Sequence, residues 1–273
     1  IIMNFKTSEY KTLKNDYLKF LKKKEAKGKP LTDKIVKFNK FYLPLSKWIY
    51  SIYSTDFKVK TIGLSGGQGA GKSTITAILK FIFKKKYGLD ICIFSIDDFY
   101  KTRNERKKMS KNFHPLFLTR GVPGTHDVNL LSKTLENLKK KKFKPVFIPR
   151  FDKSLDDRMK KSKWTKITKR PSIIIFEGWC IGAKHQKNEK LKKSLNFIEK
   201  KHDVDLKWRK KVNYELKNRY NKLFNKIDKL IYLKAPSFEY IFKWRLLQEK
   251  KLKLTSKNRE IMSKSKVREF IMY

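Results

Sequence analysis

The chain carries, at residues 66 to 73, the stretch Gly66-Gly67-Gln68-Gly69-Ala70-Gly71-Lys72-Ser73, which fits the pattern GxxxxGK followed by Ser or Thr. Residues 59–65, just before it, are apolar and include β-branched side chains, as in a buried parallel strand. Residues 73–86, just after it, place Ile75, Ile78, Leu79 and Ile82 at three- and four-residue spacings, which is typical of a helix. A strand, a glycine-rich loop and a helix in this order predict a loop that binds phosphate groups.

The residue types in this loop suit a polyphosphate. Several backbone N–H groups must approach the phosphates closely, and glycine permits this because it lacks a Cβ. The helix N-terminus adds unpaired donors, Lys72 can reach the β- and γ-phosphates, and the Ser73 hydroxyl can bind Mg²⁺. The alternative, a glycine-rich turn without a ligand, is disfavoured by the flanking strand and helix. We therefore expect an ATP or GTP site built from Gly66, Gly67, Gln68, Gly69, Ala70, Gly71, Lys72, Ser73 and Thr74.

The composition indicates a folded and strongly basic protein. Hydrophobic residues make up 40% of the chain and aromatic residues 14%, which is enough for a core. The 69 Lys and Arg against 25 Asp and Glu give a formal charge of +44, which would favour nucleic acid or an anionic membrane as a partner. The basic residues are mostly lysines spread along the whole chain, without an arginine-rich stripe. We therefore expect non-specific, salt-sensitive binding of polyanions and no specific nucleic-acid site.

Cysteine usage and hydropathy predict a cytoplasmic protein. Cys92 and Cys180 lie far apart in the sequence without CxxC spacing, and histidines do not cluster, so we expect reduced thiols and no structural metal. The N-terminal residues lack a signal-peptide core, and the apolar runs are too short to span a bilayer. No membrane partner is expected, and the oligomeric state stays open.

Strand-like and helix-like segments alternate after residue 58. Strands are expected at 59–65, 91–95, 146–148, 173–176 and 230–233, and helices at 73–86, 130–142, 202–224 and 238–253. This alternation predicts an α/β domain over residues 59–273, with a mostly parallel sheet and helices on both faces. Residues 1–58 predict two or three short helices, interrupted at Pro30 and Pro44, that pack on this core as an extension.

Acidic residues stand at two predicted strand ends, where ligands bind in sheets of this kind. Asp97 and Asp98 follow the strand at 91–95, and Glu177 follows the strand at 173–176. A carboxylate at such a position can deprotonate a hydroxyl or hold Mg²⁺, and phosphoryl transfer needs both. The alternatives are a turn or N-cap role for Asp97 and a buried pairing with a lysine for Glu177.

Two polar loops are candidates for binding a second substrate. The loop 120–127 contains Arg120, His126 and Asp127, although Asp127 or Thr125 could instead cap the helix that follows. The segment 149–154 contains charged residues, Arg150 and Lys153 among them, that could bind an acidic acceptor or stabilise a transferring phosphoryl group.

The stretch Asn225-Lys226-Ile227-Asp228 matches the NKxD pattern that reads guanine in GTPases. In those proteins the pattern follows its strand, whereas here it precedes the strand at 230–233. The match is therefore interpreted as accidental, and ATP is favoured over GTP.

Five motifs together resemble one family. GGQGAGKS, SIDDFYKT, RGVPGTHD, PRFDKS and FEGWCIGA occur in the order and approximate spacing of the D-glycerate 3-kinase family, P-loop kinases related to uridine kinase, pantothenate kinase and phosphoribulokinase. The resemblance covers roughly residues 40–273 and implies a P-loop NTPase fold with ATP and Mg²⁺ as cofactors. It also implies transfer of the γ-phosphoryl group to a hydroxyl of a small molecule, with D-glycerate as the first candidate. The alternatives are another acceptor, such as a sugar, nucleoside or pantothenate-like compound, and a non-catalytic ATP-binding protein associated with nucleic acid.

The resemblance also implies roles for individual residues. Asp97 is expected to be the catalytic base, with Lys72 and Glu177 as further catalytic residues. Ser73 and Glu177 are the expected Mg²⁺ ligands, with Asp97 as an additional candidate, and Arg245 is expected to reach the ATP phosphates. The expected acceptor-binding residues are Asp98, Tyr100, Arg120, His126, Asp127, Arg150, Asp152 and Lys153.

The chain departs from the family pattern in two places. Residues 155–158 replace a longer, glycine-containing stretch, which implies a differently shaped acceptor pocket. The sequence ends at Tyr273, where relatives continue, so we expect a truncated sequence.

Overall fold

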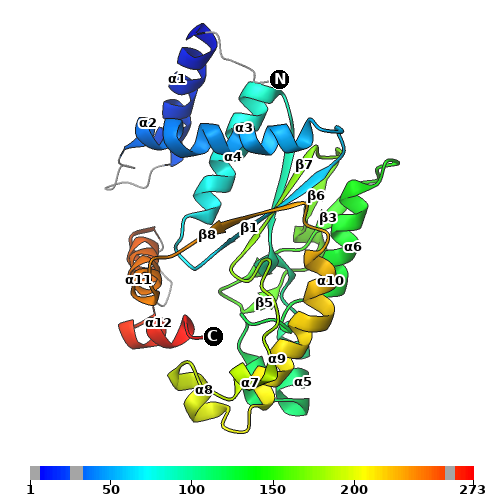
Figure 1. The fold of residues 1–273 in the computed structure, drawn as a ribbon, viewed down its shortest axis with the longest axis vertical. Helices are drawn as coiled ribbons and strands as arrows, with labels where there is room; N and C mark the ends of the chain where they lie inside the picture. Colours follow the sequence, from blue (N-terminus) through cyan, green and yellow to red (C-terminus); the bar gives the residue numbers. More distant parts are fainter. Residues whose placement is uncertain (1–6, 25–32, 256–261) are drawn as a thin grey trace. The chain divides into compact units, whose positions relative to one another are not determined.

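The structure is a computed structural model that describes residues 7–24, 33–255 and 262–273, and it is drawn as a ribbon in Figure 1. The strands are β1 (Lys60–Gly66), β2 (Ile91–Ser95), β3 (Val146–Ile148), β4 (Phe151–Asp152), β5 (Asp157–Arg158), β6 (Thr165–Ile167), β7 (Ile173–Gly178) and β8 (Lys229–Leu233). The α-helices are α1 (Thr7–Lys24), α2 (Lys34–Lys37), α3 (Leu43–Tyr53), α4 (Lys72–Tyr87), α5 (Arg103–Asn112), α6 (Val128–Lys139), α7 (Asn188–Leu191), α8 (Phe197–His202), α9 (Lys207–Glu215), α10 (Asn221–Phe224), α11 (Phe238–Thr255) and α12 (Lys264–Phe270). Short 3₁₀ helices are η2 (Ile96–Phe99), η3 (Pro115–Leu118) and η4 (Lys161–Lys163), and π-helical segments are η1 (Phe38–Tyr42) and η5 (Leu216–Tyr220).

The central sheet has four parallel strands in the order β2-β7-β1-β8. Neighbouring strands are far apart in sequence, as in an α/β fold whose strands are joined by helical crossovers. β1 pairs in parallel with β8, so that Gly66 lies opposite Leu233. The order places β7, which ends with Glu177 and Gly178, between the strand before the phosphate loop and the strand before Asp97. The expected fold is therefore confirmed.

The expected strand at 146–148 forms, but it does not join this sheet. β3 pairs in antiparallel fashion with β6 in a separate two-stranded sheet. Val146 and Ile148 are buried while Phe147 is 49% exposed, so one face of β3 meets solvent. All three residues of β3 are apolar, so the sequence alone did not distinguish this two-stranded pairing from a strand buried on both faces.

Two expected helices differ in their limits. α6 begins at Val128 and ends at Lys139, because Lys140 takes an extended conformation with ψ 136°. The expected continuous helix over 202–224 is divided, since Leu206 has φ 63° and α9 begins only after it. The run from Lys207 to Phe224 then passes through the π-helical segment η5.

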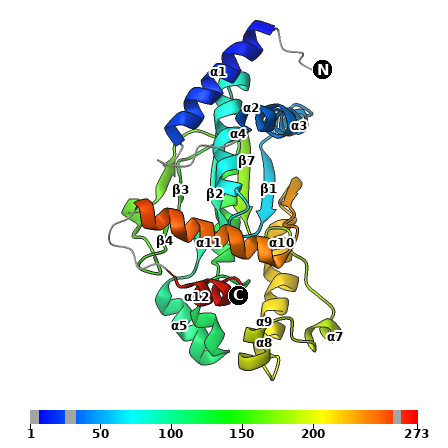
Figure 2. The same cartoon turned by 90° about the vertical axis from the view of Figure 1, so that its left-hand side faces the viewer.

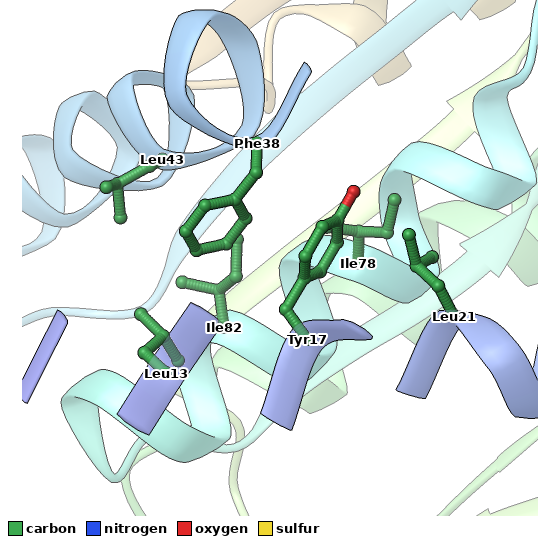
Figure 3. Close-up of a cluster of buried hydrophobic side chains, with 7 residues drawn as sticks. All are labelled: Leu13, Tyr17, Leu21, Phe38, Leu43, Ile78 and Ile82. Carbon is green, nitrogen blue, oxygen red and sulfur yellow. The ribbon is translucent and has the colours of Figure 1, made fainter. Parts of the chain in front are cut away.

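One compact unit comprises residues 1–60, 73–92 and 171–174. Its described N-terminal helices share a hydrophobic cluster with α4, the helix after the phosphate loop, and Figure 3 shows the buried side chains Leu13, Tyr17, Leu21, Phe38, Leu43, Ile78 and Ile82. The rings of Tyr17 and Phe38 lie 4.5 Å apart. The aromatic-rich N-terminal sequence therefore packs against this helix.

Pro44 does not interrupt the helical run at Lys34–Tyr53. It occupies the first turn of α3, where a missing N–H is tolerated, and η1 precedes it directly. Pro30 lies outside the described residues.

The second compact unit comprises residues 61–72, 93–170 and 175–273. It contains its own apolar cluster, with Phe117 and Trp208 among the buried residues. Helix α12 packs on α11, as Figure 2 shows from a second direction. Each helix within the described residues is too short or too polar to cross a membrane.

The stretch that matches NKxD has a structural role in this unit. The Asp228 carboxylate accepts a hydrogen bond of 2.6 Å from the Thr61 backbone, at the end of β1 opposite the phosphate loop, and it also pairs with Lys139 at 3.3 Å. Lys226 pairs with Glu136 of α6. These contacts join α6 and the start of β8 to β1, at the end of β1 that lies away from the phosphate loop.

Candidate active site

The phosphate loop takes the form that its glycines predict. Gly69 has φ 79° and Gly71 has φ 85°, a left-handed conformation that other residues adopt at a cost. The Lys72 ammonium donates to the carbonyl oxygens of Gly66 at 2.7 Å and Gly67 at 3.0 Å, so it lies back across the loop. Ser73 and Thr74 follow directly in the first turn of α4.

Helix α11 lies against this loop, which sequence reasoning did not predict in detail. The nearest atoms to a Cβ placed on Gly67 belong to Ile241. A Cβ placed on Gly69 would lie 2.4 Å from the Cβ of Trp244. Arg245, the next residue, pairs with Glu249 at 2.5 Å and lies 5.6 Å from the Phe270 ring. Arg245 therefore lies on the helix that packs against the loop, and its guanidinium forms an ion pair with Glu249.

Asp97 and Asp98 follow β2 in the short helix η2. Ser95 caps η2, its side chain accepting from the Asp97 backbone at 3.2 Å, and the Asp98 carboxylate accepts from the Ser95 backbone at 3.4 Å. Asp98 takes the capping role that was the alternative for Asp97, and it also pairs with Arg150 at 3.5 Å. The Asp97 side chain is thus available for other contacts.

The Asp97 carboxylate is held on both of its oxygens. Oδ2 lies 2.9 Å from the Lys153 ammonium, and Oδ1 accepts a hydrogen bond of 3.1 Å from the Tyr100 hydroxyl. Burial raises the pKa of Asp97, but the charge and hydrogen bond of Lys153 and the hydrogen bond of Tyr100 outweigh it, so the net pKa is below its ordinary value. Asp97 is therefore ionised at neutral pH.

Glu177 and Lys72 lie close enough to affect each other. Burial raises the pKa of Glu177, and the Lys72 charge offsets only part of that effect. Burial lowers the pKa of Lys72, which Glu177 and Asp97 partly offset. Glu177 Oε2 is buried and has no hydrogen-bond partner among the described residues. A buried carboxylate oxygen without a partner fits a site that a cation completes.

The hairpin of β4 and β5 carries Lys153 to Asp97. In this hairpin Asp152 lies opposite Asp157, and the Asp152 carboxylate accepts from the backbones of Ser154 at 2.8 Å and Leu155 at 3.2 Å. Asp152, an expected acceptor-binding residue, thus shapes the turn of the hairpin. Residues 155–158, the shortened stretch, form the end of the turn and β5, which pairs with β4 to close this hairpin.

The loop 120–127 is fixed by ion pairs. Arg120 pairs with Asp156 and its guanidinium lies 5.4 Å from the Phe151 ring. Asp127 caps α6, accepting from the Leu130 backbone at 3.0 Å, and pairs with Arg158 at 3.4 Å. The capping alternative considered for Asp127 is therefore the one observed.

Arg106 is a buried residue of this region that sequence reasoning missed. Its guanidinium donates to the Leu118 carbonyl at 2.6 Å and pairs with the Asp156 carboxylate at 2.9 Å. Its sequence context, a basic stretch in α5, resembles a solvent-exposed helix face, so the pattern gave no signal. Arg106 and Arg120 share Asp156 and so connect α5, the loop 120–127 and the hairpin.

His126 is buried and does not lie open to solvent. Its ring stacks on Tyr100 with 4.4 Å between ring centroids, and its Nδ1 lies 2.6 Å from the Tyr220 hydroxyl. Burial lowers the pKa of His126 to about 3, with the nearby Asp97 charge opposing that shift. The imidazole is therefore neutral at physiological pH. Tyr220, 94 residues away in sequence, was also missed, and no pattern in its helix marks it.

Comparison with known proteins places this geometry in a family. The model of the phosphoribulokinase / uridine kinase family matches residues 61–244. An uncharacterised kinase of Schizosaccharomyces pombe, mug58, is 36% identical over 218 residues, which cover 77% of this chain and 76% of that protein. The chloroplastic D-glycerate 3-kinase of Arabidopsis thaliana is 29% identical over 250 residues, which cover 85% of this chain and 51% of that protein. This chain thus spans about half the length of the chloroplastic enzyme.

Solved structures show the same fold. The D-glycerate 3-kinase from Cryptococcus neoformans superposes with a TM-score of 0.68 at 24% identity, covering 98% of this chain and 86% of that one. The family model matches a range that contains the phosphate loop and the acidic residues at the ends of β2 and β7. The chain belongs to the phosphoribulokinase / uridine kinase family and has the fold of P-loop kinases.

Proposed function

We propose that this protein is an ATP- and Mg²⁺-dependent kinase that transfers the γ-phosphoryl group to a hydroxyl of a small anionic acceptor, with D-glycerate as the first candidate. The observation that carries the proposal is the Asp97 carboxylate at the end of β2, kept ionised by Lys153 at 2.9 Å and bonded to the Tyr100 hydroxyl at 3.1 Å. A protein that only binds ATP has no need of a fixed, charged base at this position.

In the proposed reaction Asp97 accepts the proton of the acceptor hydroxyl, and the oxygen of that hydroxyl attacks the γ-phosphorus. The bond between the γ-phosphorus and the oxygen that bridges it to the β-phosphate breaks, and ADP leaves. Lys72 exchanges its bonds to the carbonyls of Gly66 and Gly67 for phosphate oxygens, and its charge offsets the charge that develops during transfer. The backbone N–H groups of the loop and of the first turn of α4 hold the remaining phosphate oxygens. Most of the rate enhancement then comes from positioning and electrostatics.

The residues present fit a magnesium ion. Ser73 is the second residue of α4, directly after Lys72, and Glu177 offers the buried oxygen Oε2, which lacks a partner among the described residues. A hydroxyl and a carboxylate are oxygen ligands of the kind that Mg²⁺ prefers. When bound, the ion would neutralise charge on the ATP phosphates.

An anionic acceptor suits the charges around Asp97. The side chains of Arg150 and Lys153 are about half exposed, at 52% and 54%, although each also contacts an aspartate. The carboxylate of a bound acceptor can form charged hydrogen bonds with Arg150 and Lys153 while these side chains keep their contacts with the aspartates. Similarity to the D-glycerate 3-kinase of Arabidopsis thaliana supports D-glycerate as the first compound to test.

The test is ATP consumption by the purified protein with Mg²⁺, measured against D-glycerate and a panel of sugars, nucleosides and pantothenate-like alcohols. Lys72→Ala serves as the blank. Glycerate-dependent turnover that is absent in the blank would support the proposal in full, whereas turnover with another compound would keep the reaction and change the acceptor. ATP binding without turnover on any compound would contradict it and favour the non-catalytic alternative.

A further inference from the structure

One phenol holds both the backbone and a side chain of the loop that contains His126. The Tyr220 oxygen lies 2.6 Å from His126 Nδ1 and accepts a hydrogen bond of 2.9 Å from the Gly124 backbone. All three groups are buried, Tyr220 and His126 at 0% and 1% exposure. The contact is therefore shielded from water, which could otherwise replace either partner.

A count of hydrogens decides which way the Tyr220–His126 bond runs. If Tyr220 donates to Nδ1, the imidazole proton is on Nε2, and only that N–H lacks a partner among the described residues. If Nδ1–H donates instead, the Tyr220 oxygen must accept twice, which leaves both its own O–H and the Nε2 lone pair unpaired. Each buried polar group without a hydrogen-bond partner destabilises the arrangement that contains it. The first arrangement, with a proton on Nε2, is therefore favoured.

The backbone around Tyr220 is unusual. Tyr220 is the last residue of η5, a π-helical segment inside the run from α9 to α10. A π turn contains one residue more than an α turn and so rotates the following side chains around the helix axis, and such turns are frequent at functional sites. Here the rotation accompanies a tyrosine that is fully buried against Gly124 and His126.

The contact continues to the base. The imidazole stacks on the Tyr100 ring with 20° between their planes, and the Tyr100 hydroxyl donates to Asp97. The Tyr220 hydroxyl contacts Gly124 and His126, so its effect on the base passes through His126 and Tyr100.

We propose that Tyr220 is a positioning residue for phosphoryl transfer, which fixes His126 as the Nε2–H tautomer and thereby holds the Tyr100 ring that orients Asp97. The inference rests on the proposed function, in which Asp97 accepts the acceptor's proton. A base that rotates freely loses alignment with the acceptor hydroxyl, and small misplacements of this kind cost about 100-fold in rate.

The test replaces Tyr220 by Phe, which removes one oxygen and keeps the ring. Acceptor-dependent kcat is expected to fall at least tenfold with the KM for ATP unchanged. The ¹⁵N signals of His126 are expected to show a single Nε2–H tautomer in the unaltered protein and a mixture in the variant, and the chain has only 4 histidines to assign. The matched control is Tyr214→Phe, a tyrosine of α9 that is 57% exposed, which is expected to change neither quantity.

A double-mutant cycle with Tyr100→Phe tests the route. If Tyr220 acts through Tyr100, the double variant loses little more than the larger single loss; additive losses would contradict that route. A folded Tyr220→Phe variant with unchanged kcat would overturn the proposal, as would an Nδ1–H tautomer in the unaltered protein. If that variant does not fold, the tautomer of His126 in the unaltered protein still tests the proposal, because the proposal requires Nε2–H. If no acceptor is turned over, the proposed function fails, while the tautomer measurement still tests the Tyr220 contact separately.

Discussion

At the residue scale, Asp97 and Glu177 are two carboxylates whose surroundings shift their pKa values in opposite directions. Both are subject to burial, which raises the pKa of each. For Asp97 the contact with Lys153, together with smaller contributions that include the Tyr100 hydrogen bond, outweighs burial, whereas for Glu177 the Lys72 charge does not. Separation of pKa values between neighbouring acids is how an active site assigns different roles to the same chemical group. Asp97 is suited to accept a proton, and Glu177 is suited to gain a cation.

The contact with Lys153 predicts a change in pH dependence. A base with a lowered pKa stays active as the pH falls below the ordinary range of an aspartate, and it loses activity only when the pH passes its own pKa. Lys153→Ala removes the largest contribution that lowers the pKa of Asp97, so this pKa rises. We expect the acidic limb of the kcat/KM profile to move to higher pH in this variant.

The control for this prediction is Lys163→Ala, which removes an exposed lysine of the short helix η4. That variant should keep the profile of the unaltered protein. An unmoved acidic limb in Lys153→Ala would show that Lys153 does not set the charge of Asp97.

Part of this site could be predicted from sequence, because the carboxyl ends of parallel strands meet at one edge of the sheet. That rule predicted that Asp97 and Glu177 lie at the same edge of the sheet as the phosphate loop. In the structure both carboxylates affect the pKa of Lys72. The rule could not say that Arg120 would pair with Asp156, 36 residues away, or that Tyr220 would contact His126, 94 residues away. Such pairings depend on which loops the fold brings together, and a local pattern carries no record of them.

At the element scale, the packing of α11 on the phosphate loop distinguishes two glycines that have similar backbones. Gly69 and Gly71 have φ 79° and 85°, but a Cβ on Gly69 would meet Trp244 at 2.4 Å, while a Cβ on Gly71 would meet nothing within 4 Å. The atom met at 2.4 Å is the Trp244 Cβ, and the Trp244 backbone carbon lies at 3.0 Å. Neither atom can move without a shift of the helix.

We predict that alanine at Gly69 and alanine at Gly71 have unequal effects on stability and ATP affinity. Gly71→Ala should lower the free energy of unfolding by about 1–2 kcal/mol, the cost of a left-handed conformation for a residue with a Cβ. Gly69→Ala carries the same cost and also displaces α11, so we expect a larger loss of stability and at least a tenfold weaker ATP affinity. Chemical denaturation and calorimetric ATP binding would measure both. Equal effects of the two variants would mean that α11 does not press on the loop.

The same scale shows why some elements could be predicted and others could not. β1, β2, β7 and α4 have strong apolar patterns, and they lie close to the expected limits. β6 is exposed at two of its three positions, so its pairing with β3 left little trace in the sequence. The π-helical segment η5 ends at Tyr220, which is buried against Gly124, and helical periodicity encodes neither the π turn nor this contact.

At the scale of the whole molecule, the charge of +44 is the dominant property. Lysines account for most of it and are spread over the sequence, which favours weak attraction to any polyanion over one specific site. Such attraction consists mainly of counterion release and depends steeply on salt.

We therefore predict that the protein binds RNA and heparin at low salt, without sequence preference, and that binding falls by orders of magnitude between about 50 and about 200 mM salt. Titrations with two unrelated RNA sequences at several salt concentrations would measure this. A strong preference for one sequence that persisted at the higher salt would contradict the prediction and would favour a role associated with nucleic acid.

The central claim, that Asp97 is the base of a small-molecule kinase, is tested most directly by Asp97→Asn, a change that keeps the shape of the side chain and removes its charge. The measurement compares acceptor-dependent ATP turnover with ATP affinity in the variant and the unaltered protein. We predict a fall in kcat of about 10²–10⁴-fold, the usual contribution of a general base, with ATP affinity retained. Turnover at the unaltered rate in a folded variant that binds ATP normally would contradict the claim.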